Sequence, residues 1–243
     1  MKSIEDISAL NRYIELFNAQ YYPDSPLKPI VGGGKTEEPE LMMIFINPTK
    51  KNVASDPSWT GLRVPWIGLS PIWKVFQESG LVSDSMLEEI LQSKKNWTPE
   101  FTERVYTAMG RSGIYITNIV KWAGEDATLP EKEKIDRYLP ILKKEIELVR
   151  PKHIVAFGTV PYNNLTGEKV PFKAVFDKSI ATHALPLKEI EVNGHKTTIV
   201  PCYFPVGMGR FNRPQAIKIL AAIKNQLQVP VATIERTDIF MTK

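Results

Sequence analysis

The sequence predicts a single α/β domain of three layers, in which helices cover both faces of a mostly parallel, four-stranded central sheet. Short apolar runs of strand length alternate along the chain with longer segments of helical periodicity. The central runs are apolar at nearly every position, as in parallel strands buried on both faces. At 243 residues the chain can bury one large core without a second domain. We therefore assign residues 1–243 to one domain, with its core at about 41–226.

The first forty residues are expected to add one helix and a long loop. Apolar side chains recur at helical spacing over 3–18, which predicts a helix packed on the core with Ser3 as its candidate N-cap. Residues 20–40 are rich in turn formers and are predicted to be a loop. The run GGGKT at 32–36 lacks the first glycine of a phosphate loop, because Pro29 stands there, and it precedes a strand. We reject a phosphate loop here.

The remaining elements follow from apolar runs, turn signals and capping residues. Core strands are predicted at 41–46, 114–120, 154–157 and 196–205, with an antiparallel arm at 188–192 joined through an Asn193-Gly194 turn. Helices are predicted at 70–80, 84–92, 98–109, from a capping box at Thr128 to about 149, briefly after Gly158, and from an Asn212 cap to about 226. Residues 229–243 are predicted to be either an edge strand or loose chain.

Composition excludes several classes of protein. The single cysteine, Cys202, rules out internal disulfides and cysteine-ligated clusters, and the three histidines are too far apart to suggest a metal site. No apolar run is long enough to cross a membrane, and the N-terminus lacks the apolar core of a secretory signal. We expect a cytoplasmic monomer without metal or cofactor. The net charge of +4 is compatible with nucleic-acid binding without requiring it.

Residues 41–68 carry the strongest functional signal. The apolar run 41–46 ends at Asn47-Pro48, because proline cannot donate to a sheet. Asn47 should therefore lie at the carboxyl end of a central strand, where open α/β sheets bind ligands. Its amide offers a donor and an acceptor for a water or a polar ligand. The segment 61–66 then supplies a glycine turn, Arg63 and Trp66; taken alone, these residues favour a plain loop with a core tryptophan over a ligand site.

The other strand ends change that balance. Parallel strands share a direction, so their carboxyl ends should bring Asn47, Asn118, Gly158 and the loop after Pro205 to one edge of the sheet. Cations interleaved with aromatic side chains suit phosphate contacts and base stacking. The residues expected to gather there are Lys50, Lys51, Arg63, Lys121, Arg210 and Arg213, beside Trp66, Trp122 and Phe211.

On these residues the sequence resembles the uracil-DNA glycosylase superfamily, most closely its single-strand-selective monofunctional and mismatch-specific branches, over about 41–226. The run Phe45-Ile46-Asn47-Pro48 is similar to the motif whose asparagine positions the attacking water, with Phe45 in place of the usual glycine. Trp66 stands where the family stacks an aromatic ring on the extruded base, and Asn118 where an asparagine reads uracil.

The second catalytic motif of the family departs from the usual pattern. Residues 201–205 are similar to it, but Phe204 replaces the histidine that many members use to support charge on the base. The mismatch-specific branch also lacks this histidine. Its loss removes an electrostatic contribution worth a few kcal/mol in comparable sites.

The resemblance implies a monofunctional DNA glycosylase of base excision repair. It would hydrolyse the N-glycosidic bond of uracil or another deaminated base in damaged or mismatched DNA, single- or double-stranded. The implied residues are Asn47 and Phe204 at the catalytic positions, Phe45, Trp66 and Asn118 around the base, and Lys50, Lys51, Arg63, Lys121, Met208, Arg210, Phe211 and Arg213 on the DNA, with Met208, Arg210 or Phe211 as the wedge that enters the duplex.

Several alternatives stay open. Lys50 or Lys51 would make the enzyme a glycosylase-lyase if either formed a Schiff base, which requires a desolvated lysine. Asp56 is the nearest carboxylate for a general base, and His183 would replace the missing histidine if its loop folded inward. A relative that binds nucleic acid or nucleotide without cleavage is the main rival, favoured by Phe45 and Phe204. A hydrolase of free nucleosides or nucleotides is the third.

Overall fold

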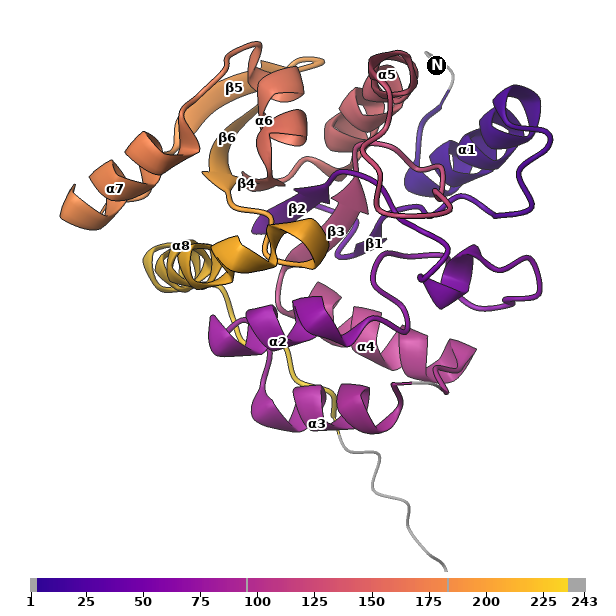
Figure 1. Ribbon diagram of the computed structural model, residues 1–243, viewed down its shortest axis with the longest axis horizontal. Coiled ribbons are helices and arrows are strands. Elements are labelled where there is room, and N and C mark those ends of the chain that lie inside the picture. The colour runs from indigo at the N-terminus through magenta and orange to yellow at the C-terminus, as the bar shows by residue number, and fades with distance from the viewer. Residues whose placement is uncertain (1–3, 95, 183, 236–243) are drawn as a thin grey trace, which may run out of the picture.

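A six-stranded sheet lies between two layers of helices in the computed structural model, which describes residues 4–94, 96–182 and 184–235 (Figure 1). The strand order is β1-β3-β2-β4-β6-β5. The four central strands run parallel: β3 (Ile114–Asn118), β2 (Leu41–Phe45), β4 (His153–Phe157) and β6 (His195–Cys202). The edge strands β1 (Gly33–Gly34) and β5 (Lys188–Val192) are antiparallel to their neighbours. The predicted α/β class and parallel centre are confirmed.

Alternate residues of the central strands face opposite layers of helices, since successive side chains of a strand point to opposite faces. In β2, Leu41, Met43 and Phe45 face one core, while Met42 and Ile44 face the other. The first core is covered by α2 (Ser70–Glu78), α3 (Asp84–Gln92), α4 (Pro99–Arg111) and α8 (Arg213–Gln226), and the second by α1 (Ile7–Tyr21), α5 (Lys132–Val149) and α6 (Thr159–Thr166) (Figure 1).

Two helix starts differ from the predicted ones. Helix α1 begins at Ile7, because Asp6 caps it by accepting from the Ala9 amide at 2.7 Å; Ser3 lies outside the described residues. The capping box at Thr128 is wrong. Asp126 accepts from the Thr128 amide at 2.8 Å and turns the chain there, so α5 begins only at Lys132.

Asn212 occupies the N-cap position of α8 as predicted, but its side chain makes no capping hydrogen bond. The 3-10 helix η2 (Gly207–Asn212) runs directly into α8 instead. A second 3-10 helix, η1 (Val53–Ser55), and helix α7 (Phe172–Thr182) complete the elements.

The segment predicted as a loop at 20–40 contains the edge strand β1. Its glycines serve close backbone approach: a Cβ on Gly34, whose φ is +114°, would lie 2.1 Å from the Ile114 carbonyl oxygen. The end of the described chain is extended rather than loose, since Ala232 bridges to Val82 and is fully buried. Residues 236–243 lie outside the described residues.

Candidate active site

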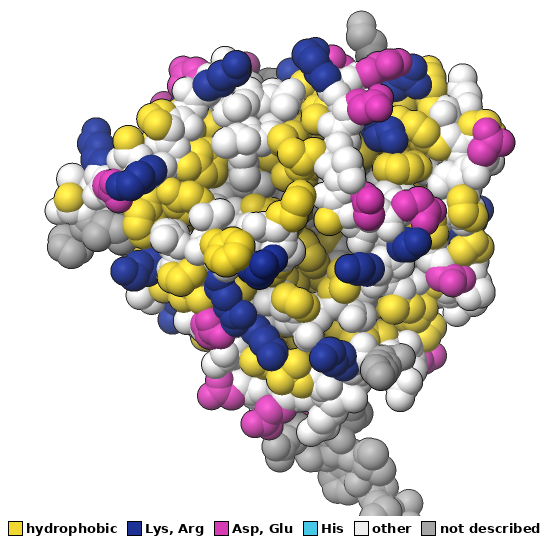
Figure 2. Space-filling view, viewed as in Figure 1, with side chains coloured by type: hydrophobic (Ala, Val, Ile, Leu, Met, Phe, Trp, Pro, Cys, Tyr) yellow, Lys and Arg dark blue, Asp and Glu magenta, His cyan; other side chains and the backbone are white. Residues whose placement is uncertain are grey.

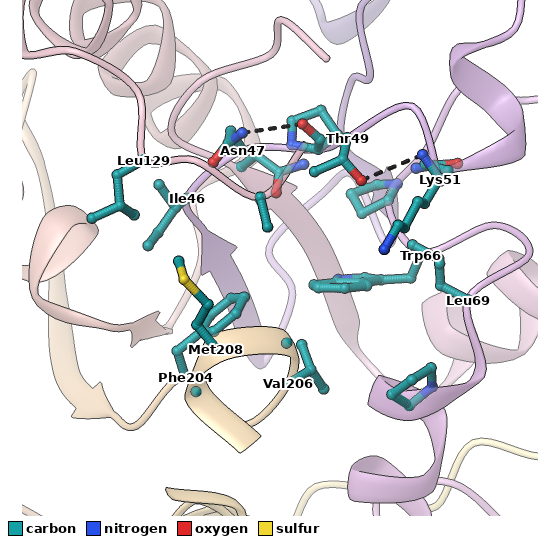
Figure 3. A pocket seen from close by; sticks show the side chains of 18 residues that line it. Ile46, Asn47, Thr49, Lys51, Trp66, Leu69, Leu129, Phe204, Val206 and Met208 are labelled. Carbon is teal, nitrogen blue, oxygen red and sulfur yellow. Dashed lines mark hydrogen bonds between the residues drawn. The ribbon is translucent and has the colours of Figure 1, made fainter. Parts of the chain in front are cut away.

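A cavity of about 500 Å³ opens at the carboxyl ends of the parallel strands (Figure 3). Its walls come from residues 46–52 after β2, residues 65–71 leading into α2, the end of β3 with residues 127–129, and residues 204–209 after β6. Parallel strands deliver their following loops to one edge, which explains why segments so distant in sequence meet. The cavity lies where the strand-end argument predicted a ligand site.

Asn47 lies in the wall just beyond β2. Its Nδ2 donates to the Pro48 carbonyl at 3.2 Å, which fixes the orientation of the amide (Figure 3). The Oδ1 makes no hydrogen bond within the described part of the chain, so it is available as an acceptor. Half-buried on a backbone that proline removes from the sheet, this oxygen is suited to hold one water molecule.

Asn118 ends β3 and lines the same cavity. It is 2% exposed, and its Nδ2 has no hydrogen-bond partner among the described residues. A buried donor without a partner costs about 1–3 kcal/mol. A ligand in the cavity is the partner that would recover this free energy.

Trp66 places its indole in the cavity from a strained backbone position. Its φ of +68° is left-handed, which is uncommon for a bulky residue. Two bonds hold the turn: Trp73 Nε1 donates to the Trp66 carbonyl at 3.2 Å, and the Tyr106 hydroxyl donates to the Pro65 carbonyl. Strain that the surroundings maintain in this way is typical of functional sites.

Two phenylalanines stand behind or beside the tryptophan. Phe204 lines the cavity at the position predicted for the family histidine, so a ring without a hydrogen-bond donor lies in the cavity wall there. The expectation that Phe45 contacts the ligand is corrected. Phe45 is 1% exposed, stacks on Phe157 at 4.1 Å, and meets the Trp66 ring edge-on at 4.9 Å, beneath the cavity lining.

The predicted cations separate into lining, rim and structural residues. Lys51 lines the cavity, and its side chain extends towards Trp66 (Figure 3). Lys50 pairs with Glu125 at 2.9 Å, and both are exposed. Lys and Arg side chains border a hollow with a largely hydrophobic floor on this face (Figure 2). Arg213 pairs with Glu78.

Two of the predicted DNA contacts are corrected. The Arg63 guanidinium donates to the carbonyls of Ala54, Asp56, Pro57 and Trp59, so it holds a loop together. Lys121 is fully buried against Glu145, 2.5 Å away. Burial lowers the pKa of Lys121, while the Glu145 carboxylate acts to raise it.

The loop predicted as a wedge forms the outer rim of the cavity. Met208 lines the cavity and is 69% exposed, whereas Phe211, at 75%, lies further out with the Arg210 guanidinium 4.5 Å above its ring. A Cβ on Gly209 would lie 2.1 Å from the Phe204 carbonyl oxygen, so glycine lets η2 fold back on the end of β6. The rim therefore projects apolar side chains into solvent.

The alternatives for a general base find no support in the geometry. Asp56 is exposed and does not line the cavity, and hydrogen bonds from Ser58 lower the pKa of its carboxyl group. His183 lies outside the described residues. Among the described residues that line the cavity, none is a carboxylate.

Sequence reasoning missed several lining residues. Leu69, Pro71 and Val206 form apolar wall, and Leu129, 55% exposed, stands at the mouth. No short motif marks these positions. Leu129 was hidden because it lies inside the false capping box at Thr128.

An α/β sheet that presents two amides and an indole to one cavity at its carboxyl edge defines a site for a flat ring with polar edges. The family model of the uracil DNA glycosylase superfamily matches residues 32–228, most of the chain. The chain belongs to this superfamily, which confirms the resemblance at the level of the superfamily and implies DNA glycosylase chemistry in general. Within the described ranges, no helix has the length and apolar character needed to cross a bilayer.

Proposed function

We propose that this protein is a monofunctional DNA glycosylase that hydrolyses the N-glycosidic bond of uracil, or of a related deaminated base, in DNA. The observation that carries the proposal is the meeting of Asn47, Trp66 and the unpaired Asn118 amide in one cavity. Asn118 Nδ2 would donate to O4 of uracil while its Oδ1 accepts from N3–H, a pairing that cytosine reverses. Stacking on the Trp66 indole would add about 1–3 kcal/mol.

Cleavage builds positive charge on the sugar as the base leaves with the bonding electrons. Asn47 Oδ1 would hold the attacking water on the far face of the sugar. As the new C–O bond forms, the water releases a proton to solvent, and the departing base anion takes one up. With no carboxylate in the described lining, the water is positioned more than it is deprotonated. Phe204 supplies no hydrogen bond to the departing base, so the chemistry suits good leaving groups and modest rates.

The base must first leave the stack, at a cost of a few kcal/mol that is smallest for mispaired or single-stranded bases. Met208 and Phe211 on the exposed rim are suited to fill the space that the base leaves. Lys51 would contact a phosphate beside the extruded nucleotide. The partner is thus damaged or mismatched DNA.

A lyase step receives no support from the lysines. A Schiff base needs a desolvated amine that reaches the sugar. Lys51 reaches the cavity but is exposed, while Lys121 is desolvated but paired with Glu145 and absent from the lining. We therefore favour the monofunctional reaction.

The test is cleavage of labelled oligonucleotides that carry uracil, hypoxanthine or xanthine, single-stranded or mispaired, developed with alkali. We expect alkali-dependent cleavage that falls by about 100-fold or more in Asn47→Ala and in Asn118→Ala. Asn225→Ala, on the exposed face of α8, is the matched control and should retain full activity. Cleavage without alkali would contradict the monofunctional reaction, and full activity of Asn47→Ala would contradict its role.

A relative that binds nucleic acid without cleaving it is the second candidate, and Phe204 at the histidine position favours it. Salt-dependent DNA binding with no cleavage of any of these substrates would establish this second function and overturn the first.

A further inference from the structure

A buried ion pair lies next to Asn118, outside the cavity lining. The side chains of Lys121 and Glu145 are 0% and 1% exposed, with Nζ and Oε2 2.5 Å apart. Lys121 Nζ also donates to the Asn118 carbonyl oxygen at 2.8 Å and to the Thr117 hydroxyl. All three protons of the ammonium group are thereby used, and one of them fixes the peptide of the residue that reaches the cavity.

The Glu145 carboxylate is also fixed by hydrogen bonds. Glu145 Oε1 accepts from the Tyr115 hydroxyl at 2.8 Å and from the Thr117 hydroxyl at 3.0 Å. Tyr115 and Thr117 lie on β3, and Glu145 lies on α5. The network therefore clamps the end of β3 to the helix that covers it.

The glycine segment before β2 is shaped around this network. A Cβ on Gly32 would lie 2.1 Å from the Tyr115 hydroxyl oxygen and 2.6 Å from Glu145 Oε1. Nearby, the Ile30 amide donates to the Lys121 carbonyl at 2.9 Å. Lys121 is thus fixed through its side chain and its main chain at once.

A contribution to stability does not by itself explain why the protein buries the Lys121–Glu145 ion pair. Two buried charges are expensive to desolvate, and well-packed neutral residues often replace them without loss of stability. The side chain of Asn118 gives a second reason. Because its Nδ2 has no partner among the described residues, the protein fixes this amide through the backbone and packing rather than through a hydrogen bond to Nδ2.

We propose that Lys121 and Glu145 are positioning residues for the base-reading amide of Asn118, with the Lys121 ammonium holding the Asn118 peptide in the orientation that recognition requires. The inference rests on the proposed function and adds to it the origin of base selectivity. Neither residue touches the substrate.

The test compares two double variants, neutral at both positions, of which only one retains an N–H donor at position 121. Lys121→Gln/Glu145→Gln keeps a donor for the Asn118 carbonyl, whereas Lys121→Met/Glu145→Gln has none. In both, the substitution at 145 retains an acceptor for the Tyr115 hydroxyl. Urea unfolding first establishes that the two variants fold with similar stability.

The first readout is single-turnover cleavage of uracil-containing DNA. We expect the Met-containing variant to lose about tenfold or more in rate and to lose selectivity between bases, with an unchanged Kd for DNA. The Gln-containing variant should recover a substantial part of the rate. In the Asn118→Ala background the two variants should be equally active, because effects that pass through one residue are not additive.

The second readout does not depend on cleavage. The side-chain amide signals of Asn118 in proton–nitrogen NMR spectra, assigned by their loss in Asn118→Asp, should shift or broaden in the Met-containing variant only. Equal rates and unchanged amide signals in the two variants would overturn the positioning role. If the wild type cleaves no base, the proposed function fails, while the amide signals still decide whether Lys121 orients Asn118.

Discussion

The two sides of the cavity use aromatic residues in opposite ways. On the sheet side, Phe45 is 1% exposed and packs between Phe157 and the ring of Trp66. On the η2 side, Phe211 is 75% exposed, with the Arg210 guanidinium 4.5 Å from the centre of its ring. The first arrangement fixes the groups that would read a base, and the second leaves apolar surface for DNA. Under the proposed function, base recognition and DNA contact would therefore fall to separate parts of the site.

The largest effect should come from removing the support on the sheet side. Phe45→Ala leaves a cavity beneath Trp66 and should lower the free energy of unfolding by about 4 kcal/mol, as expected for a buried phenylalanine. Urea unfolding measures it, with Phe211→Ala as the matched control that changes stability by less than about 0.5 kcal/mol. Similar losses in the two variants would remove the distinction between the two sides.

The groups on the sheet side were the most predictable from sequence. Asn47 and Asn118 were found because apolar runs locate strands and parallel strands share an edge. Trp66 and Phe204 follow from the same argument with the family resemblance, and all four line the cavity. The inferences on Asn47 and Asn118 use only the order of residues along each strand.

The order of residues along the strands could not distinguish solvated cations from buried or structural ones. Whether a lysine is solvated depends on partners distant in sequence: Glu145, which neutralises Lys121, lies 24 residues away on α5. Arg63 bonds to carbonyl groups, which every residue carries, so sequence cannot mark them. The two-residue strand β1 has no periodicity to detect, and Thr128 matched a capping motif that Asp126 prevents from forming.

Arg63 and Arg210 show the same contrast between a structural role and an exposed position on the rim, now for charged side chains. Arg63→Ala removes the donor for four carbonyls and should destabilise the protein by about 2 kcal/mol. Arg210→Ala should leave stability unchanged and reduce the slope of log Kd for DNA against log salt by about one. Urea unfolding and fluorescence anisotropy at several salt concentrations measure the two quantities. If Arg63→Ala reduced the slope of log Kd against log salt and left stability unchanged, Arg63 would be a DNA contact after all.

A smaller effect is expected from the apolar rim. Phe211→Ala should slow excision from duplex DNA by about tenfold, since the wedge offsets part of the few kcal/mol of unstacking, and should affect single-stranded substrate little. Single-turnover assays on paired and unpaired uracil measure the ratio. Leu16→Ala, an equally solvated apolar residue of α1, is the control. Equal slowing on both substrates would mean that Phe211 contacts the DNA strand that carries the base and does not assist base extrusion.

The smallest effect concerns an ion pair on the rim, in which Lys50 Nζ lies 2.9 Å from Glu125 Oε2. Both side chains are more than half exposed, at 56% and 63%, so the pair contributes at most about 1 kcal/mol to stability. For DNA binding, however, Glu125 competes with phosphate for Lys50 and repels the backbone. Glu125→Gln should therefore tighten DNA binding by about two- to threefold and steepen its salt dependence.

The control for this variant must change net charge equally without touching the rim. Glu40 forms a comparable pair with Lys152 at 2.6 Å, but at the amino ends of β2 and β4, the opposite edge of the sheet. Glu40→Gln should leave the DNA affinity near that of the wild type, because exposed charges farther apart than a Debye length of about 8 Å are largely screened. Equal tightening by both substitutions would mean that net charge alone attracts DNA. It would contradict the assignment of DNA binding to the carboxyl edge of the sheet. Tightening by Glu125→Gln alone would place the phosphate backbone beside Lys50, on the same rim as the cavity that contains Asn47 and Asn118.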